Sequence, residues 1–195
     1  MKEIIFFSNN KNKIQEISNL FIKFNYKLLS LNNFKNVVSP KENGKTFKEN
    51  AKIKSIYGYK KFNKLCFADD SGICIDALND KPGINSKQYI GSEKKENIVL
   101  NKIISLAKKK DKYNAFFETS ICLTINIDKQ IFFTGRVDGK ISLKIRGNNG
   151  FGYDPIFIPN GMDLTFSEMN MYQKNLLSHR AIAIKKLSKY LTNLV

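Results

Sequence analysis

The sequence predicts a mixed α/β fold, and three features of the chain support this prediction. Ile4 to Phe7 form a continuous apolar run of strand length, as in a strand that is buried on both faces. Residues with helical periodicity follow at once, and residues 115–127 and 130–137 then have the pattern of two long strands. Alternating strands and helices favour parallel pairing and consecutive strands favour antiparallel pairing, so we expect one mixed sheet.

The composition is that of one globular domain, residues 1–195. Of the 195 residues 42% are hydrophobic, which is enough for a sizeable core. Lys and Arg number 33 against 17 Asp and Glu, which gives a formal net charge of +16. Lysines spread along a chain are typical of a solvated coat that keeps a protein soluble. A phosphate-bearing ligand or a nucleic acid would suit the same charge, so the charge does not choose between them.

The three cysteines, Cys66, Cys74 and Cys122, lie in apolar strand-like runs and lack the C-x-x-C spacing of a zinc site. They indicate buried, reduced thiols and therefore a cytoplasmic protein. The first apolar run is too short for a signal peptide, and no run approaches the length of a membrane span. We therefore expect no membrane partner.

The segment after the first strand has the features of a phosphate site. Ser8, Asn9 and Asn10 lead into a helix that Asn10 is suited to cap. Lys11 and Lys13 lie in its first turn, where the helix dipole disfavours cations and favours anions. Because lysine is so common in this chain, two lysines in one turn could also be chance. The apolar positions of this helix are Ile14, Ile17, Leu20, Phe21 and Phe24.

The second helix follows a polar loop that contains an unexplained acid. A strand over residues 27–31 comes first, and Thr46 to Glu49 then match a capping box that opens the helix. Glu42, in the loop before it, has no such local role, so it is either a solvated loop acid or a carboxylate available to a site. Asn50 and Lys54 lie one turn apart and could reach a shared site, although Lys54 could equally be a surface lysine.

Two adjacent carboxylates, Asp69 and Asp70, follow an apolar run at residues 65–68. Asp, Ser and Gly are the usual turn residues, so Asp69 to Gly72 are expected to turn the chain before a short strand at residues 73–75. The pair is either such an acidic turn or part of a metal site. Mg²⁺ commonly takes one or two carboxylates together with substrate phosphates.

Turns and periodic segments alternate in the next part of the chain. A turn at Lys81 to Gly83 precedes a third helix over residues 93–109, whose terminal lysines favour the negative end of the helix dipole. These lysines are therefore interpreted as structural. Residues 115–127 and 130–137 are predicted to form a hairpin, with a further turn at Asp138–Gly139 before a returning strand.

Residues 146–155 are rich in glycine, which lets a ligand approach the backbone closely. Phe151 and Tyr153 offer a stacking surface for a base, although both could instead pack in the core. His179, the only histidine, and Arg180 lie at the start of the last helix. Two donors in a first turn could point at an acceptor-rich ligand.

Taken in order, these motifs resemble the inosine/xanthosine triphosphate pyrophosphatase family, whose members remove deaminated purine nucleotides. Each motif alone is weak, but seven of them in the right order and spacing span nearly the whole chain. They are Ser8-Asn9-Asn10 with Lys13, the segment from Glu42 through Gly44, Thr46, Phe47, Glu49, Asn50 and Ala51 to Lys54, Ala68-Asp69-Asp70-Ser71-Gly72, Pro82-Gly83-Ile84, Gly150-Phe151-Gly152-Tyr153-Asp154-Pro155, Thr165-Phe166 with Glu168-Met169, and Lys174 with Ser178-His179-Arg180.

The resemblance implies a Mg²⁺-dependent enzyme that converts a purine nucleoside triphosphate (ITP, dITP or XTP) to the monophosphate and pyrophosphate. It implies an elongated mixed sheet flanked by helices, with an active-site cleft between two lobes, and a homodimer. It makes Asp70 the catalytic carboxylate, Glu42 and Asp70 the metal ligands, and Asp69 a supporting acid. The substrate-binding residues that it implies are Ser8, Asn9, Asn10, Lys11, Asn12, Lys13, Lys54 and Ser71 for the phosphates, and Phe151, Gly152, Tyr153, Asp154, Lys174, His179 and Arg180 for the base.

Two positions depart from the family pattern. Gln88 stands where the family often has Arg, so a phosphate-binding role there would be weakened or pass to Lys87, and Asn9 stands where Gly is common. Two other functions stay open. One is a basic nucleic-acid-binding protein, although no nucleic-acid-binding motif is visible and we expect no specific nucleic-acid partner. The other is a related pyrophosphatase that acts on other nucleotides.

Overall fold

The structure, a computed structural model, describes residues 2–21 and 26–194. It divides into two compact units. The first unit comprises Met1–Asp70, Thr119–Gly135 and Arg180–Val195, and the second comprises Ser71–Glu118 and Arg136–His179. Phe24, a predicted apolar position of the first helix, lies outside the described residues. Within the described ranges, no helix combines the length and the apolar character that a membrane crossing requires.

Seven strands of the described chain form a mixed sheet, as the sequence predicts. Their order is β2-β1-β3-β5-β6-β7, and β4 pairs with β3. β1 pairs in parallel with β2 and β3, whereas β4 with β3 and β7 with β6 are antiparallel. The strands are β1 (Lys2–Phe6), β2 (Tyr26–Ser30), β3 (Cys66–Ile75), β4 (Lys81–Pro82), β5 (Asn114–Asn126), β6 (Lys129–Ile141) and β7 (Phe157–Pro159).

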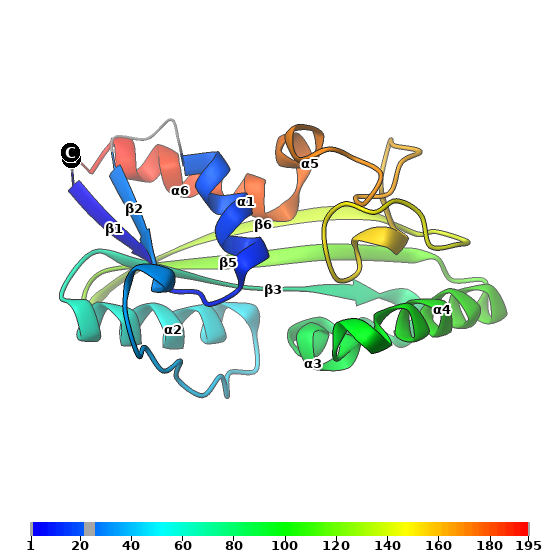
Figure 1. The fold of residues 1–195 in the computed structure, drawn as a ribbon, viewed down its shortest axis with the longest axis horizontal. Coiled ribbons are helices and arrows are strands. Elements are labelled where there is room, and N and C mark those ends of the chain that lie inside the picture. Colours follow the sequence, from blue (N-terminus) through cyan, green and yellow to red (C-terminus); the bar gives the residue numbers. More distant parts are fainter. Residues whose placement is uncertain (1, 22–25, 195) are drawn as a thin grey trace. The chain divides into compact units, whose positions relative to one another are not determined.

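In the first unit, helices cover both faces of the sheet (Figure 1). Successive strand residues point to opposite faces. Ile4 and Phe6 accordingly join a hydrophobic cluster with α1 and α6, whereas Ile5 and Phe7 join a second cluster, against which α2 packs. Burial on both faces explains the continuous apolar run that predicts β1. The helices are α1 (Lys11–Phe21), α2 (Phe47–Phe62) and α6 (His179–Thr192).

The starts of α1 and α2 lie where the sequence predicts them. The Lys13 backbone N–H donates to Asn10 Oδ1 at 3.1 Å, so Asn10 caps α1. The Glu49 backbone N–H donates to Thr46 Oγ1 at 3.1 Å, while the Glu49 side chain accepts the backbone N–H of Lys45 at 2.6 Å. Glu49 thus helps to cap the start of α2. Glu42 is the acid in this loop that has no such local role.

The second unit contains three helices, α3 (Ser86–Ile90), α4 (Glu93–Lys110) and α5 (Met171–Leu177). Its core joins the inner face of α4, at Leu100, Ile103, Ile104 and Ala107, to apolar residues of β3 and β5 and of the segment 153–169. α4 is the predicted third helix. α3, α5 and β7 were not predicted, because elements of three to seven residues are too short for periodicity to reveal.

Two predicted turns are wrong because the chain continues as a strand. β3 runs without interruption through Asp69 to Gly72, in a stretch where nearly every residue is buried. A Cβ at Gly72 would overlap Gly83 O, so this glycine permits close packing and does not turn the chain. β6 likewise continues through Asp138–Gly139 and pairs with β7 there. A Cβ at Gly139 would overlap a carbonyl of β7, so this glycine also permits close packing.

The turn predicted at Lys81 to Gly83 lies two residues earlier. Asn79 and Asp80 both have positive φ, of 52° and 60°, which suits the short polar side chains of Asn and Asp. The chain can therefore reverse there, and Lys81–Pro82 form β4 against the end of β3.

Candidate active site

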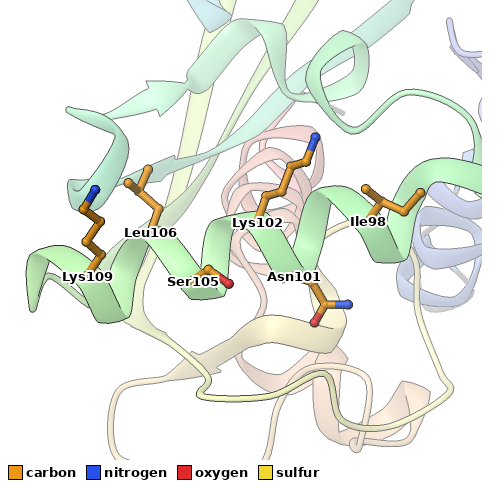
Figure 2. Close-up of a pocket in the computed structure, with 6 residues that line it drawn as sticks. All are labelled: Ile98, Asn101, Lys102, Ser105, Leu106 and Lys109. Atoms are coloured by element: carbon orange, nitrogen blue, oxygen red, sulfur yellow. The ribbon is translucent and has the colours of Figure 1, made fainter.

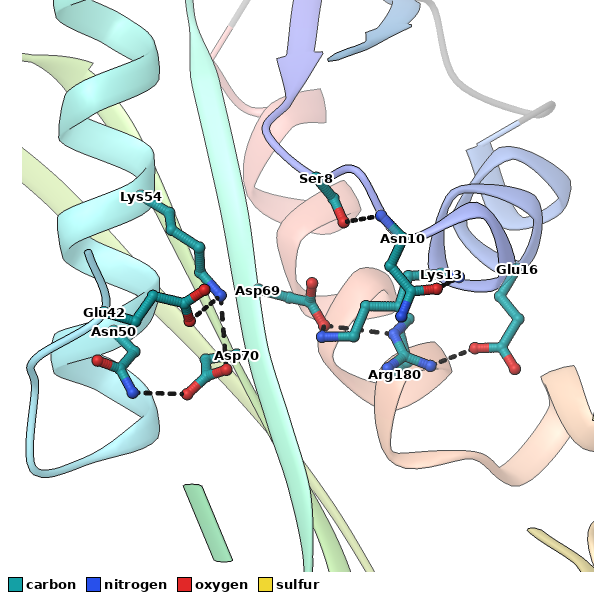
Figure 3. A network of polar contacts seen from close by, with 10 residues as sticks. All are labelled: Ser8, Asn10, Lys13, Glu16, Glu42, Asn50, Lys54, Asp69, Asp70 and Arg180. Carbon is teal, nitrogen blue, oxygen red and sulfur yellow. Dashed lines mark hydrogen bonds and ion pairs between the residues drawn. The ribbon is translucent and has the colours of Figure 1, made fainter. Parts of the chain in front are cut away.

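The alternation of side chains along β3 sends the two adjacent acids to opposite faces of the sheet. Phe67 belongs to the cluster formed with α1 and α6, and Ala68 to the cluster against which α2 packs. Two residues on, Asp69 points toward α1 and α6, and Asp70 points toward α2 (Figure 3). One pair of neighbouring residues therefore belongs to two separate polar networks.

Asp70 is held by α2 and faces the loop acid Glu42. Asn50 Nδ2 donates to Asp70 Oδ2 at 3.1 Å. Lys54 Nζ lies 3.5 Å from Asp70 Oδ1 and 2.8 Å from Glu42 Oε2. Asp70 is only 8% exposed, and burial raises its pKa above the usual value against the opposing effect of Lys54 and Lys13. A buried carboxylate of raised basicity next to a lysine is an arrangement typical of catalytic sites.

Asp69 lies in a buried cluster of charges on the other face. Its Oδ2 is 2.9 Å from Lys13 Nζ and 3.4 Å from Arg180 Nε. Arg180 also forms an ion pair with Glu16, and Arg180 and Glu16 are both buried. Burial alone would raise the pKa of Asp69, but the charges of Lys13, Arg180 and Lys54 outweigh it and hold that pKa well below its usual range. Asp69 is therefore the charge partner of Lys13 and Arg180 on this face of the sheet.

The loop before α1 carries the residues predicted to hold phosphates. The Asn10 backbone N–H donates to Ser8 Oγ at 3.2 Å, which shapes the loop into the helix N-terminus. Asn9 Nδ2 donates to Ser39 Oγ at 3.1 Å, so the residue in the place of the common Gly ties the loop to residue 39. Lys11 and Asn12 are exposed in the first turn. Of this loop and first turn, Lys13 brings its ammonium group to Asp69.

The second unit holds the residues predicted to bind the base. Lys174 Nζ lies 2.6 Å from Asp154 Oδ2, which also accepts the Phe151 backbone N–H at 2.9 Å. Lys174 Nζ lies 5.1 Å from the centre of the Phe151 ring. A Cβ at Gly150 would overlap Asp154 Oδ2, so the glycine is needed where the loop closes over this carboxylate. Lys174, Asp154 and Phe151 thus form one local cluster.

Tyr153 and His179 are buried beside this cluster. The sequence allows Tyr153 either to stack on a base or to pack in the core. Its ring belongs to the core, and its hydroxyl donates to Ser86 O at 2.8 Å. The His179 ring stacks on Phe117 with the ring centres 4.7 Å apart. Gly152 has a positive φ of 66°, which a residue with a side chain rarely adopts.

A model of the Ham1 family matches residues 4–190 of the chain. The chain belongs to the Ham1 family. A protein of Christiangramia forsetii named dITP/XTP pyrophosphatase is 39% identical over 97% of this chain and 99% of its own length. A Bacillus subtilis protein of the same name is 38% identical over 98% of each chain. The structure of a HAM1 protein from Coxiella burnetii, 34% identical, matches with a TM-score of 0.87 over 99% of this chain and 100% of its own.

In this Ham1 chain the predicted site residues fall into two groups. The first unit brings together Ser8, Asn10, Lys13, Glu42, Lys54, Asp69, Asp70 and Arg180, with Asn9, Lys11 and Asn12 in the same loop and first turn. The second unit contains Ser71, Phe151, Gly152, Tyr153, Asp154, Lys174 and His179. Arg180 lies in the first unit and donates to Asp69, a carboxylate, so base binding by Arg180 stays a prediction.

Two polar residues that contact the first group, Glu16 and Asn50, are not among the site residues that the sequence predicts for this Ham1 chain. Glu16 lies three positions after Lys13 on α1 and is buried, which is unusual for Glu and is the signal that could have found it. The sequence indicates Asn50 only by its position one turn from Lys54. Its contacts with Asp70 and the Glu42 loop come from the tertiary structure.

The donor set fits a magnesium ion. Glu42 Oε2 and Asp70 Oδ1 both approach one cationic atom, Lys54 Nζ, so the two carboxylates converge, and two carboxylates are what Mg²⁺ commonly uses beside substrate phosphates. In the described part of the chain, no group of three or more His, Cys, Asp or Glu is placed to hold a metal, so the protein would supply two ligands and the substrate or water the others. Asp69 Oδ1, on the other face of the sheet, is buried without a hydrogen-bond partner among the described residues.

A surface hollow elsewhere in this Ham1 chain has none of these features. All the residues that line it belong to α4, in the second unit (Figure 2). They include two lysines and no acid, and none of them belongs to either group of predicted site residues. They are Ile98, Asn101, Lys102, Ser105, Leu106 and Lys109.

Proposed function

We propose that this protein hydrolyses deaminated purine nucleoside triphosphates (ITP, dITP and XTP) to the monophosphate and pyrophosphate, with Mg²⁺ as cofactor. The observation that carries the proposal is the acid pair on β3, in which Asp69 meets Lys13 from α1 and Asp70 meets Lys54 from α2. Full-length relatives named dITP/XTP pyrophosphatase support the substrate class. A nucleic-acid-binding role lacks comparable support.

The residues suit hydrolysis at the α-phosphorus. Asp70, which Asn50 and Lys54 hold in place, orients and deprotonates the attacking water. Lys13 and Lys54 are available to exchange their carboxylate contacts for phosphate oxygens and neutralise the polyphosphate. Glu42 and Asp70 hold Mg²⁺, which when bound supplies further neutralisation of phosphate charge. Pyrophosphate is the leaving group.

Recognition of the base is assigned to the cluster around Lys174. A deaminated purine has a 6-oxo group where adenine has a 6-amino group, so a donor such as Lys174 would be satisfied by the oxygen and would face another donor in adenine. Such a mismatch of hydrogen-bonding groups discriminates strongly in a buried site, and Lys174 is buried. We further propose that the protein is cytoplasmic and that it is a homodimer. Sedimentation of the purified protein would test the dimer.

We expect pyrophosphate release from ITP, dITP and XTP, and a value of kcat/KM for ATP that is lower by at least about 100-fold. The measurement is a panel of ITP, dITP, XTP, GTP, ATP and the pyrimidine triphosphates at equal Mg²⁺. A preference for GTP or for a pyrimidine nucleotide would assign the protein to a related pyrophosphatase. No release from any nucleotide, together with salt-sensitive binding of DNA, would overturn the proposed function.

We expect the activity to require the metal. Treatment with EDTA should lower ITP hydrolysis by at least about 100-fold, because the metal's share of charge stabilisation is several kcal/mol. Titration with MgCl₂ should restore it, whereas KCl at equal ionic strength should not. Full activity of the metal-depleted protein would show that Mg²⁺ is not required. The substrate class would still be decided by the nucleotide panel.

A further inference from the structure

Asn50 connects the two acids that are proposed to hold the metal. Its Oδ1 accepts the backbone N–H of Gly44 at 2.8 Å. Its Nδ2 donates to Asp70 Oδ2 at 3.1 Å (Figure 3). Gly44 lies two residues after Glu42. We propose that Asn50 is a positioning residue that fixes the Glu42 loop and the Asp70 carboxylate in one arrangement. The inference rests on the role proposed for Asp70.

The chemistry of the two neighbours selects a carboxamide at position 50. A backbone N–H needs an acceptor, and an ionised carboxylate needs a donor. An Asp at position 50 would serve Gly44 but would face Asp70 with a second negative charge, and an aliphatic residue would serve neither. Asn50 is 5% exposed, so water is poorly placed to replace a lost partner.

The same contact determines which oxygen of Asp70 faces the loop acid. Because Asn50 occupies Oδ2, Oδ1 is the oxygen next to Lys54, and Lys54 in turn contacts Glu42. The loop is equally constrained, since a Cβ at Gly44 would lie 2.7 Å from Asn50 Oδ1. One side chain therefore controls the orientation of Asp70 and the position of the segment that carries Glu42.

Two substitutions separate the two contacts. Asn50→Asp retains an acceptor for Gly44 but removes the donor to Asp70, and we expect kcat for ITP to fall about 100-fold with KM changed by less than about threefold, as for a small misplacement of a reacting group. Asn50→Ala removes both contacts, so exchange of the Gly44 amide hydrogen, measured by NMR, should also become about tenfold faster. In Asn50→Asp this amide should stay protected.

The matched control is Ser55→Ala. Ser55 is also buried on α2 and donates to Cys66 O of β3 at 2.9 Å, but it touches neither acid. We expect it to lower stability while leaving kcat and the exchange of Gly44 unchanged. Gly44→Ala is a second test that keeps the Asn50 side chain. Its Cβ would lie 2.7 Å from both Asn50 Oδ1 and Glu49 Cβ, so it would displace the Asn50 side chain together with the loop and should reproduce the loss of kcat.

The outcomes distinguish this inference from the proposed function. If the wild-type protein hydrolyses none of the nucleotides, the proposed function fails, and the exchange of Gly44 still tests the link made by Asn50. Wild-type kcat in Asn50→Asp would overturn the inference. So would unchanged Gly44 exchange in Asn50→Ala. If Asn50→Asp does not fold, wild-type kcat in Gly44→Ala would overturn it.

Discussion

Substitution of Asp70 by Asn should lower kcat for ITP by at least about 10³-fold, because it removes both the base and one metal carboxylate. The fold should persist. Lys54 retains its 2.8 Å contact with Glu42, so the substitution leaves no isolated buried charge. We expect the free energy of unfolding in urea to change by less than about 1 kcal/mol, in the range of substitutions that leave packing intact.

Asp76→Asn is the matched control for this change. Asp76 pairs with Lys112 on the surface of the second unit, where both side chains are well exposed. The same chemical change there should leave kcat within about twofold of wild type, since exposed ion pairs contribute little. Near-wild-type turnover in Asp70→Asn would remove Asp70 from the mechanism, and collapse of its unfolding transition would show that the carboxylate is structural.

Local sequence patterns reveal the elements whose own residues carry the signal. β1 is recognisable from a run that is apolar on both faces, and α1 and α2 from residues that cap them, Asn10 and Thr46. The ordered motifs reveal the family even though each is weak alone. Each element or motif is thus recognised from residues close together in the chain, and the family from the order of the motifs along it.

The predicted turn at the acid pair fails for a physical reason. Asp, Ser and Gly favour turns when the backbone is exposed, but β3 is buried at Asp69, Asp70 and Gly72, and a buried backbone must pair. Once β3 is known to be continuous, period-two alternation from Phe67 and Ala68 assigns Asp69 and Asp70 to opposite faces. The error in one local element thus hid the arrangement of the site.

Contacts between distant residues are beyond local patterns altogether. Glu16 and Arg180 are 164 positions apart, and the residues around either one do not indicate the contact between them. Asn50 and Asp70 are 20 positions apart on different elements. Only the packing of α1, α2 and α6 against β3 brings these side chains together.

Arg180→Met should destabilise the protein by about 3–5 kcal/mol, the usual result of removing one member of a buried charge cluster. Met fills much of the same volume, so the loss is mainly electrostatic. The substitution takes the guanidinium away from two buried carboxylates, those of Glu16 and Asp69. Asp69 still has its ion pair with Lys13. The measurement is urea unfolding at pH 7. Arg136→Met, at an exposed pair with Asp138, is the control and should cost less than about 1 kcal/mol.

A double substitution identifies the origin of that cost. If Arg180→Met is costly because the buried Glu16 side chain loses the guanidinium, then adding Glu16→Gln should recover part of the loss, giving a coupling energy of about 1–3 kcal/mol. Strictly additive losses would mean that Arg180 stabilises the protein through its contact with Asp69 or through packing, and not through Glu16. Recovery of stability without recovery of ITP hydrolysis would show that turnover needs the Arg180 guanidinium itself, because the charge balance of the cluster would then be restored while the donor is still missing. That result would agree with a role of Arg180 in base binding or in holding Asp69.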